Sequence, residues 1–168
     1  DDFGRSVAAN EAVEEAFKDG ILTAASLMVG ADAAKDAVVR AHQLDRLGVG
    51  LHVVVVCGRP VLPAEEVPNL VDGSGMFDTN LVRAGFRYFF VPKVRRQLER
   101  EIRAQFDAFQ KTGLPLDHVN AHNHMHLHPT VLSLILEVGR SFGLRAMRVP
   151  DEPLSVPGAQ SLSLAGRI

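Results

Sequence analysis

The sequence of 168 residues contains one Cys, one Tyr and no Trp. A single thiol excludes an intramolecular disulfide framework and is compatible with a reducing compartment, so we expect a cytoplasmic location. No apolar run reaches the roughly 18 residues that a membrane-spanning helix needs, and the first residues show no basic and apolar signal pattern. Charges nearly balance, with 18 Lys and Arg against 20 Asp and Glu. We therefore expect neither nucleic acid nor stable membrane insertion.

Hydrophobic patterning indicates alternating strands and helices. Buried strands are predicted at residues 21–29, 47–56, 117–121 and 144–149, and helices at 31–44, 92–112 and 129–142. A further helix is expected between its cap, Ser6, and Gly20. Residues 57–80 are rich in Pro and Gly and are predicted to form a long irregular connection. The alternation predicts an α/β fold with a parallel sheet.

The predicted sheet is small for a fold of this class. Four strands are visible, one more is expected before Asp1, and residues 150–168 continue in Pro, Ser and Gly without another helix. We therefore expect a single partial domain over residues 1–168 that belongs to a barrel-like fold and is incomplete at both ends.

Polar candidate residues gather at one predicted edge of the sheet. In parallel α/β folds, ligands and catalytic groups collect at the carboxyl ends of the strands. The residues that fall there are Asp1, Asp2, His52, His122, His124, His126 and Arg148. Two imidazoles and a carboxylate suit a divalent metal such as Zn²⁺, and hydrolysis also needs a base. Adjacent carboxylates can divide these roles because consecutive side chains point in different directions.

Histidine is concentrated in one segment, since five of the seven His lie between His118 and His128. If this segment is extended, alternation at period two places His122, His124, His126 and His128 on one side. The pattern favours metal binding over an adventitious exposed tract, although not every imidazole is expected to be a ligand. Taken singly, an Asp-Asp pair is more typical of a turn or helix cap, and a lone His in an apolar strand of a hydrogen-bonded core residue.

Five motifs together resemble the YdjC-like carbohydrate deacetylase family. They are Asp1-Asp2-Phe3-Gly4, Asn10-Glu11-Ala12, Gly20-Ile21-Leu22-Thr23-Ala24-Ala25-Ser26-Leu27-Met28-Val29, Gly48-Val49-Gly50-Leu51-His52 and Asp117-His118-Val119-Asn120-Ala121-His122-Asn123-His124-Met125-His126. They run in order over about the first 150 residues. Within the family, Arg59-Pro60-Val61-Leu62-Pro63, residues 82–92 and Asn120-Ala121-His122 are most similar to the branch associated with hopanoid biosynthesis.

The resemblance implies a distorted (β/α) barrel related to the polysaccharide deacetylases, with a divalent metal ion, Mg²⁺ or Zn²⁺. It implies that Asp2, His52 and His122 are the metal ligands and that Asp1 is the catalytic base. It also implies that Arg148, in an Arg-x-Pro element, orients the base. His124 and His126 would contact substrate or donate a proton. The implied reaction removes an N-acetyl group from an N-acetylglucosamine-type glycoconjugate. The expected partner is an N-acetylated sugar or a glycolipid such as a glucosaminyl hopanoid, and a homodimer is left open.

Two departures from the family pattern stand out. Asn120 occupies a position where many relatives have Asp, which is expected to change hydrogen bonding near His122. A later His-Pro-Gly element of the relatives is absent from these residues, which leaves the general acid unassigned.

Two other functions compete with deacetylation. An amidohydrolase-like barrel hydrolase also uses His-x-His, but the early Asp-Asp and late His-x-His order favours the deacetylase. A metal-binding or sugar-binding relative without catalysis is the non-enzymatic alternative. An aromatic-rich stretch either lines an apolar approach for a lipid or packs on the barrel, and it comprises Met76, Phe77, Phe86, Tyr88, Phe89, Phe90 and Val91.

Overall fold

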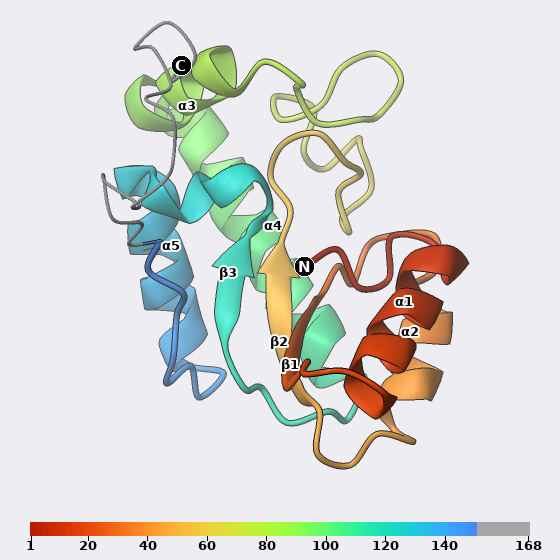
Figure 1. The fold of residues 1–168 in the computed structure, drawn as a ribbon. Helices are drawn as coiled ribbons and strands as arrows, with labels where there is room; N and C mark the ends of the chain where they lie inside the picture. The colour runs from red at the N-terminus through yellow and green to blue at the C-terminus, as the bar shows by residue number, and fades with distance from the viewer. Residues whose placement is uncertain (151–168) are drawn as a thin grey trace, which may run out of the picture.

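The computed structural model describes residues 1–150 and contains a parallel sheet. Its strands are β1 (Ala24–Leu27), β2 (Gly48–Val53) and β3 (Val119–Ala121), in the order β1-β2-β3 (Figure 1). Both strand pairs are parallel, which confirms the predicted α/β class. All three carboxyl ends therefore lie at one edge, the upper edge in Figure 1.

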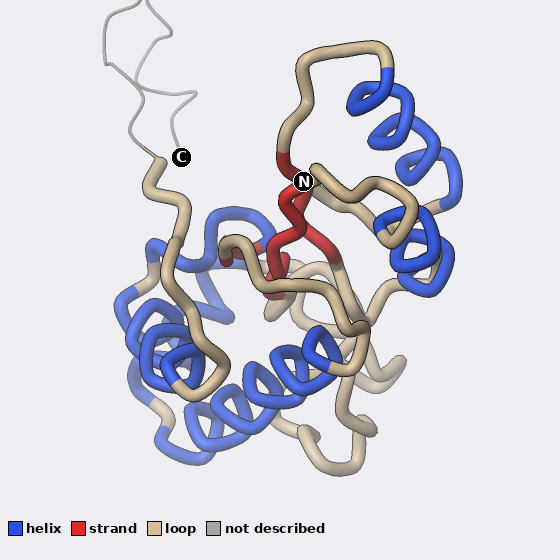
Figure 2. Tube along the Cα trace, turned by 90° about the horizontal axis from the view of Figure 1, so that it is seen from below, coloured by secondary structure: helices blue, strands red, loops and turns tan. Residues whose placement is uncertain are grey.

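Helices surround the sheet (Figure 2). They are α1 (Val7–Lys18), α2 (Ala34–Ala41), α3 (Leu81–Phe90), α4 (Pro92–Gln110) and α5 (Pro129–Arg140), with a 3₁₀ segment η1 (His122–Leu127). Ser6 caps α1 as predicted, because its side chain accepts a hydrogen bond from the Ala9 backbone N–H. Within residues 1–150, no helix is long and apolar enough to cross a membrane.

The two faces of the sheet differ in chemistry because successive strand residues point to opposite sides. One face carries Leu51 and Val119, which are buried in the core with Ile102 of α4. The other face carries polar groups: the strand register places Ser26 beside Gly50 and His52 beside Asn120. This polar face leads to the carboxyl edge, where candidate site residues were expected.

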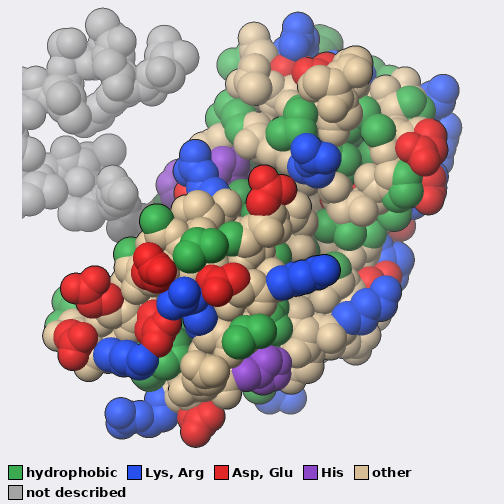
Figure 3. Space-filling view, turned by 90° about the vertical axis from the view of Figure 1, so that its right-hand side faces the viewer, with side chains coloured by type: hydrophobic (Ala, Val, Ile, Leu, Met, Phe, Trp, Pro, Cys, Tyr) green, Lys and Arg blue, Asp and Glu red, His purple; other side chains and the backbone are tan. Residues whose placement is uncertain are grey.

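Charged side chains are interspersed over α1 and α2. Figure 3 shows acidic and basic groups mixed across this face rather than gathered by sign. Arg40 of α2 contacts Asp36 of the same helix, at 2.8 Å, and also pairs with Glu14 of α1, so one ion pair links the two helices. Surface pairs of this kind contribute little to stability.

Several predicted elements differ from the structure. The strand expected at residues 144–149 is reduced to one parallel bridge between Val119 and Met147, and a matching bridge joins Phe3 to Leu27 at the opposite edge. Helix α3 was not predicted; Asn80 caps it by accepting a hydrogen bond from the Arg83 N–H. Closure into a barrel stays a prediction, and the tail predicted beyond residue 150 lies outside the described residues.

The predicted one-sided row of histidines is wrong. The segment after β3 is not extended, and Asn123 and His124 adopt left-handed φ angles of 51° and 54°. This turn separates the imidazoles: His124 is exposed, whereas His126 is buried. The chain has to turn here because α5 begins at Pro129, only a few residues after β3 ends.

The connection after β2 is irregular, as predicted, and is fixed by two buried side chains of α4 that the sequence analysis missed. Gln105 accepts a hydrogen bond from the Val54 N–H, at 2.9 Å, and donates to its carbonyl, at 2.6 Å. Glu101 accepts from the N–H groups of Val61 and Leu62 at 2.8 and 3.0 Å. Burial raises the pKa of Glu101, although these N–H donors oppose the shift.

Candidate metal centre at the carboxyl edge of the sheet

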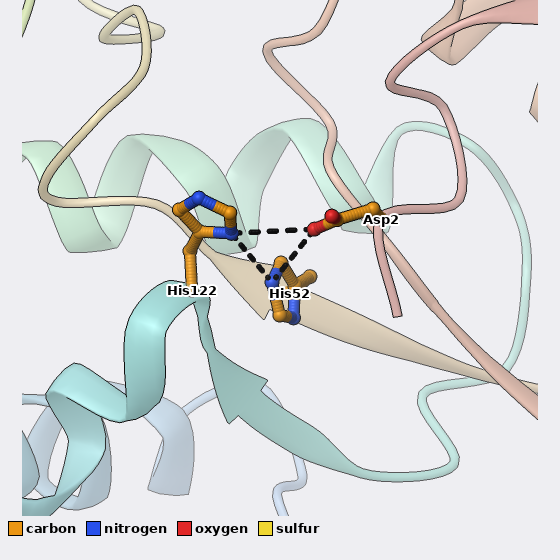
Figure 4. Close-up of side chains that lie close together, drawn as sticks. All are labelled: Asp2, His52 and His122. Atoms are coloured by element: carbon orange, nitrogen blue, oxygen red, sulfur yellow. Dashed lines mark hydrogen bonds and ion pairs between the residues drawn. The ribbon is translucent and has the colours of Figure 1, made fainter. Parts of the chain in front are cut away.

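Asp2, His52 and His122 converge at the carboxyl edge of the sheet (Figure 4). Asp2 Oδ1 lies 3.4 Å from His52 Nε2 and 3.2 Å from His122 Nδ1. The two imidazole nitrogens are 3.3 Å apart. Three elements supply these groups: the N-terminal segment, β2 and the start of η1.

The N-terminal segment aims Asp2 at the two imidazoles. Asp2 has a left-handed φ of 59°, a conformation that is uncommon outside glycine and often found at functional sites. The adjacent backbone is fixed by a hydrogen bond from the Gly4 N–H to Asn10 Oδ1, at 2.7 Å. Arg5 donates to Asp2 Oδ2 at 3.1 Å, so Oδ1 is the oxygen that faces the histidines.

The protonation states of this cluster suit metal binding. Burial lowers the pKa of His52 to about 4, so its imidazole is neutral at pH 7. Burial would raise the pKa of Asp2, but the neighbouring His122, His52 and Arg5 outweigh it and the net shift is downward. A neutral imidazole and a carboxylate are the forms that bind metals.

The spacing of the three atoms also fits one shared ion. Ligands at about 2.0–2.2 Å from a tetrahedral metal are about 3.3–3.6 Å from one another. The observed separations of 3.2, 3.3 and 3.4 Å agree with this arrangement. Asp2, His52 and His122 therefore form a group that can hold a divalent metal.

The same cluster predicts acid sensitivity of the metal-free protein. Because the pKa of His52 falls to about 4 on folding from 6.5, its contribution to stability is complete above 6.5 and is lost as pH falls towards 4. We expect the free energy of unfolding in chelator to be about 2 kcal/mol lower at about pH 5 than at about pH 7.5. Urea denaturation at both values measures the difference, which should shrink in His52→Asn. Equal stability of the wild-type protein at the two pH values would contradict the assignment.

Asp1 lies beside the cluster and has partners of its own. Arg148 donates two hydrogen bonds to its carboxylate, at 2.6 and 2.8 Å, and the Asn120 amide donates a third to Oδ1 at 2.9 Å. A paired guanidinium contact of this kind fixes the plane of a carboxylate. The structure thus brings Asp1 and Arg148 together, and the adjacent carboxylates of Asp1 and Asp2 have different partners.

The remaining histidines occupy different environments. His124 is exposed on η1, with its ring centroid 5.8 Å from that of His126. His126 is buried, and its Nδ1 accepts a hydrogen bond from the Ala121 N–H at 3.1 Å. Burial lowers the pKa of His126. His126 therefore supports the turn that presents His122, whereas His124 faces solvent.

A cleft of about 220 Å³ opens beside His122. Arg5, Asp32 and Arg59 supply polar groups to its lining, and Met28 and Met76 supply apolar ones. Cys57 is half-buried in the same cleft and has a φ of 53°. The cleft thus adjoins the metal-binding group and can accept a small polar molecule.

A parallel α/β fold with a candidate metal group at its carboxyl edge defines the class of this protein. Comparison with protein families matches residues 1–167 to the family described as "YdjC-like protein". The chain belongs to the YdjC-like family.

Curated relatives of this chain carry the name carbohydrate deacetylase. The protein from Brevibacillus brevis is 39% identical over 142 residues, and that from Geobacillus stearothermophilus is 38% identical over 154 residues. The matches cover 84% and 92% of this chain but only 54% and 57% of those relatives, so the chain spans just over half of their length.

A solved structure has a similar fold. It is that of a protein from Enterococcus faecalis V583 assigned to cellobiose-phosphate cleavage, and it superposes with a TM-score of 0.73 at 28% sequence identity. The match covers 86% of this chain and 54% of that one.

Proposed function

We propose that this chain carries the catalytic edge of a metal-dependent hydrolase that removes the N-acetyl group from an N-acetylglucosamine-type glycoconjugate. The observation that carries the proposal is the convergence of Asp2, His52 and His122 beside a separately oriented carboxylate, Asp1. The names of the curated relatives support the deacetylase reaction. The sheet is proposed to be part of the distorted barrel implied by the resemblance, and the bridging residues Phe3 and Met147 at its two edges support this.

Asp2, His52 and His122 would hold the metal, for which Zn²⁺ or Mg²⁺ is proposed. When bound, the ion supplies Lewis acidity that polarises the acetamide carbonyl and stabilises negative charge on its oxygen. The two imidazoles favour Zn²⁺, because nitrogen ligands suit it better than they suit Mg²⁺.

The chain's own residues supply the proton transfers. Asp1 accepts a proton from the attacking water while the oxygen of that water bonds to the acetamide carbon. Arg148 and Asn120 hold the Asp1 carboxylate in place. The C–N bond then breaks, and the leaving nitrogen takes a proton. His124 is the proposed donor because it is exposed, whereas His126 is buried with Nδ1 engaged. The products are acetate and a free amine.

The cleft beside His122 is the proposed sugar subsite. Arg59 is exposed in its lining and can donate hydrogen bonds to sugar hydroxyls. We expect Arg59→Ala to raise KM about tenfold with little change in kcat, because it removes a contact common to ground and transition states. Steady-state kinetics measure both constants, with Arg96→Ala on the exposed side of α4 as the matched control. An unchanged KM in Arg59→Ala would place the sugar elsewhere.

A glycolipid, such as the hopanoid implied by the resemblance, is the finer proposal for the substrate. Phe77 and Tyr88 are buried, so these aromatics pack in the core, but Phe86, Phe89 and Phe90 of α3 are 55–64% exposed. Helix α3 lies above the carboxyl edge in Figure 1, on the same side as the metal-binding group. An apolar aglycone resting on this helix would place its sugar towards the cleft.

The test is release of acetate from N-acetylglucosamine oligosaccharides and from an N-acetylglucosaminyl lipid. The proposal expects release that stops with chelator and returns with Zn²⁺ or Mg²⁺. Metal binding without acetate release from any acetylated sugar would favour the non-catalytic alternative. Hydrolysis of other amides in preference to acetamido sugars would favour the amidohydrolase-like alternative.

A further inference from the structure

Asn120 connects the candidate base to the candidate metal ligands. Its amide nitrogen is 2.9 Å from Asp1 Oδ1 and 2.9 Å from Ser26 Oγ, and its Oδ1 is 2.6 Å from His52 Nδ1. Asn120 and Ser26 are both buried on the polar face of the sheet. One side chain therefore touches Asp1, Ser26 and His52 at once.

The chain of contacts continues from Ser26 across the sheet. Ser26 Oγ on β1 is 2.9 Å from His118 Nε2, and His118 Nδ1 is 2.8 Å from Asp117 Oδ2. The His118 ring reaches β1 by crossing Gly50 of β2. A Cβ at Gly50 would lie 2.6 Å from His118 Nε2, so only glycine leaves room for this crossing.

The charges at the ends determine the direction of every hydrogen bond. The Asp1 carboxylate can only accept, so the amide nitrogen of Asn120 faces it and Oδ1 faces His52. His52 must then carry its proton on Nδ1, which leaves Nε2 unprotonated towards Asp2 and His122. This is the tautomer that a metal bound at Nε2 requires.

The hydrogen bonds of Ser26, His118 and Asp117 are compatible with this orientation of the Asn120 amide. Asp117 accepts from His118 Nδ1, and His118 Nε2 can accept the Ser26 hydroxyl proton. Ser26 Oγ is then free to accept the second N–H of Asn120. This arrangement satisfies all of these partners, and reversing the Asn120 amide would place its oxygen against the Asp1 carboxylate.

We infer that Ser26 and His118 are positioning residues for the proposed deacetylation. Ser26, held by His118, accepts the second N–H of Asn120 and so reinforces the amide orientation that Asp1 also requires, and this orientation sets the tautomer of the ligand His52. The order Asp117, His118, Ser26 resembles a nucleophilic triad, but Ser26 is 1% exposed and its oxygen already accepts from Asn120. A substrate carbonyl therefore cannot reach Ser26. The network instead acts on Asp1 and His52, which Asn120 contacts. This inference rests on the proposed function.

The test is imidazole ¹⁵N NMR of the metal-free full chain, which distinguishes protonated from unprotonated ring nitrogens. Wild-type His52 is expected to be a single Nδ1–H tautomer. In Ser26→Ala and in His118→Phe, His52 should become a mixture of the two tautomers. In His118→Gln, whose side-chain amide retains an acceptor, most of the Nδ1–H tautomer of His52 should be present again. The matched control is His42→Phe, because His42 bonds only to the Thr112 carbonyl among the described contacts of its ring. A pure Nδ1–H tautomer in both Ser26→Ala and His118→Phe would overturn the inference.

Two further measurements separate positioning from a merely structural role. Metal affinity, measured by competition with a chelator, should fall in Ser26→Ala, but by less than the about 10–100-fold that losing a group bonded directly to a ligand costs, because Ser26 acts on His52 through Asn120. Acetate release should fall through kcat with KM little changed, because the sugar cleft is intact. Failure of the proposed function would appear as absence of acetate release in the wild-type protein, whereas failure of this inference would appear as wild-type tautomer and metal affinity in the variants.

Discussion

Asp1→Asn is expected to lower the rate of acetate release by about 10²–10⁴-fold, the range by which a positioned general base contributes. The substitution keeps the shape of the side chain and an oxygen for Arg148, but an amide cannot accept the proton of the attacking water. Asp1 is not one of the three converging ligands, so metal content should remain that of the wild-type protein.

Steady-state kinetics together with metal analysis of the purified variant measure both effects. Asp19→Asn, an exposed carboxylate at the end of α1, is the matched control and should leave turnover unchanged. If Asp1→Asn turned over acetylated sugar at the wild-type rate, Asp1 would not be the base. If it lost the metal as well, Asp1 would belong to the ligand set.

His122→Ala is expected to remove both the metal and the activity. His122 Nδ1 is one of only three converging donors among the described residues. Losing a direct ligand should lower the metal affinity by more than the about 10–100-fold that losing an outer contact costs. His52→Ala should have the same effect and should also leave Asn120 Oδ1 without its imidazole partner.

Isothermal titration of the metal-free variants with Zn²⁺ measures these losses. His42→Ala, at the carboxyl end of α2 and outside the metal-binding group, should bind one metal with wild-type affinity. Retention of one tightly bound metal in His122→Ala would show that the ion is held by other residues.

Much of the fold could be predicted from local patterns. The stripe formed by Val94, Leu98, Ile102, Phe106 and Phe109 predicts α4, and every one of these residues is buried along that helix. Helix α3 escaped prediction because its aromatic residues include both buried and exposed positions. The turn of η1 escaped because alternating His suggested an extended segment, whereas left-handed backbone at Asn123 and His124 bends the chain.

The candidate site could be predicted only in part. The rule that strand ends meet at one edge gathered Asp2, His52 and His122 with four other polar residues, and the family resemblance singled out these three as metal ligands. The positioning network could not be found in this way, because Ser26 and His118 are 92 residues apart and meet only through the register of three strands. Asn120 was expected to act near His122, and it instead contacts His52 and Asp1. The signal that pointed to Asn120 was its departure from the family pattern, in which many relatives have Asp at this position.

The most direct test of the metal centre is anomalous diffraction from crystals of the full chain grown with Zn²⁺, recorded on both sides of the zinc absorption edge. The account predicts one strong peak bounded by Asp2 Oδ1, His52 Nε2 and His122 Nδ1. Crystals of a protein that releases acetate but shows its zinc peak away from these three atoms, or no peak at all, would contradict it.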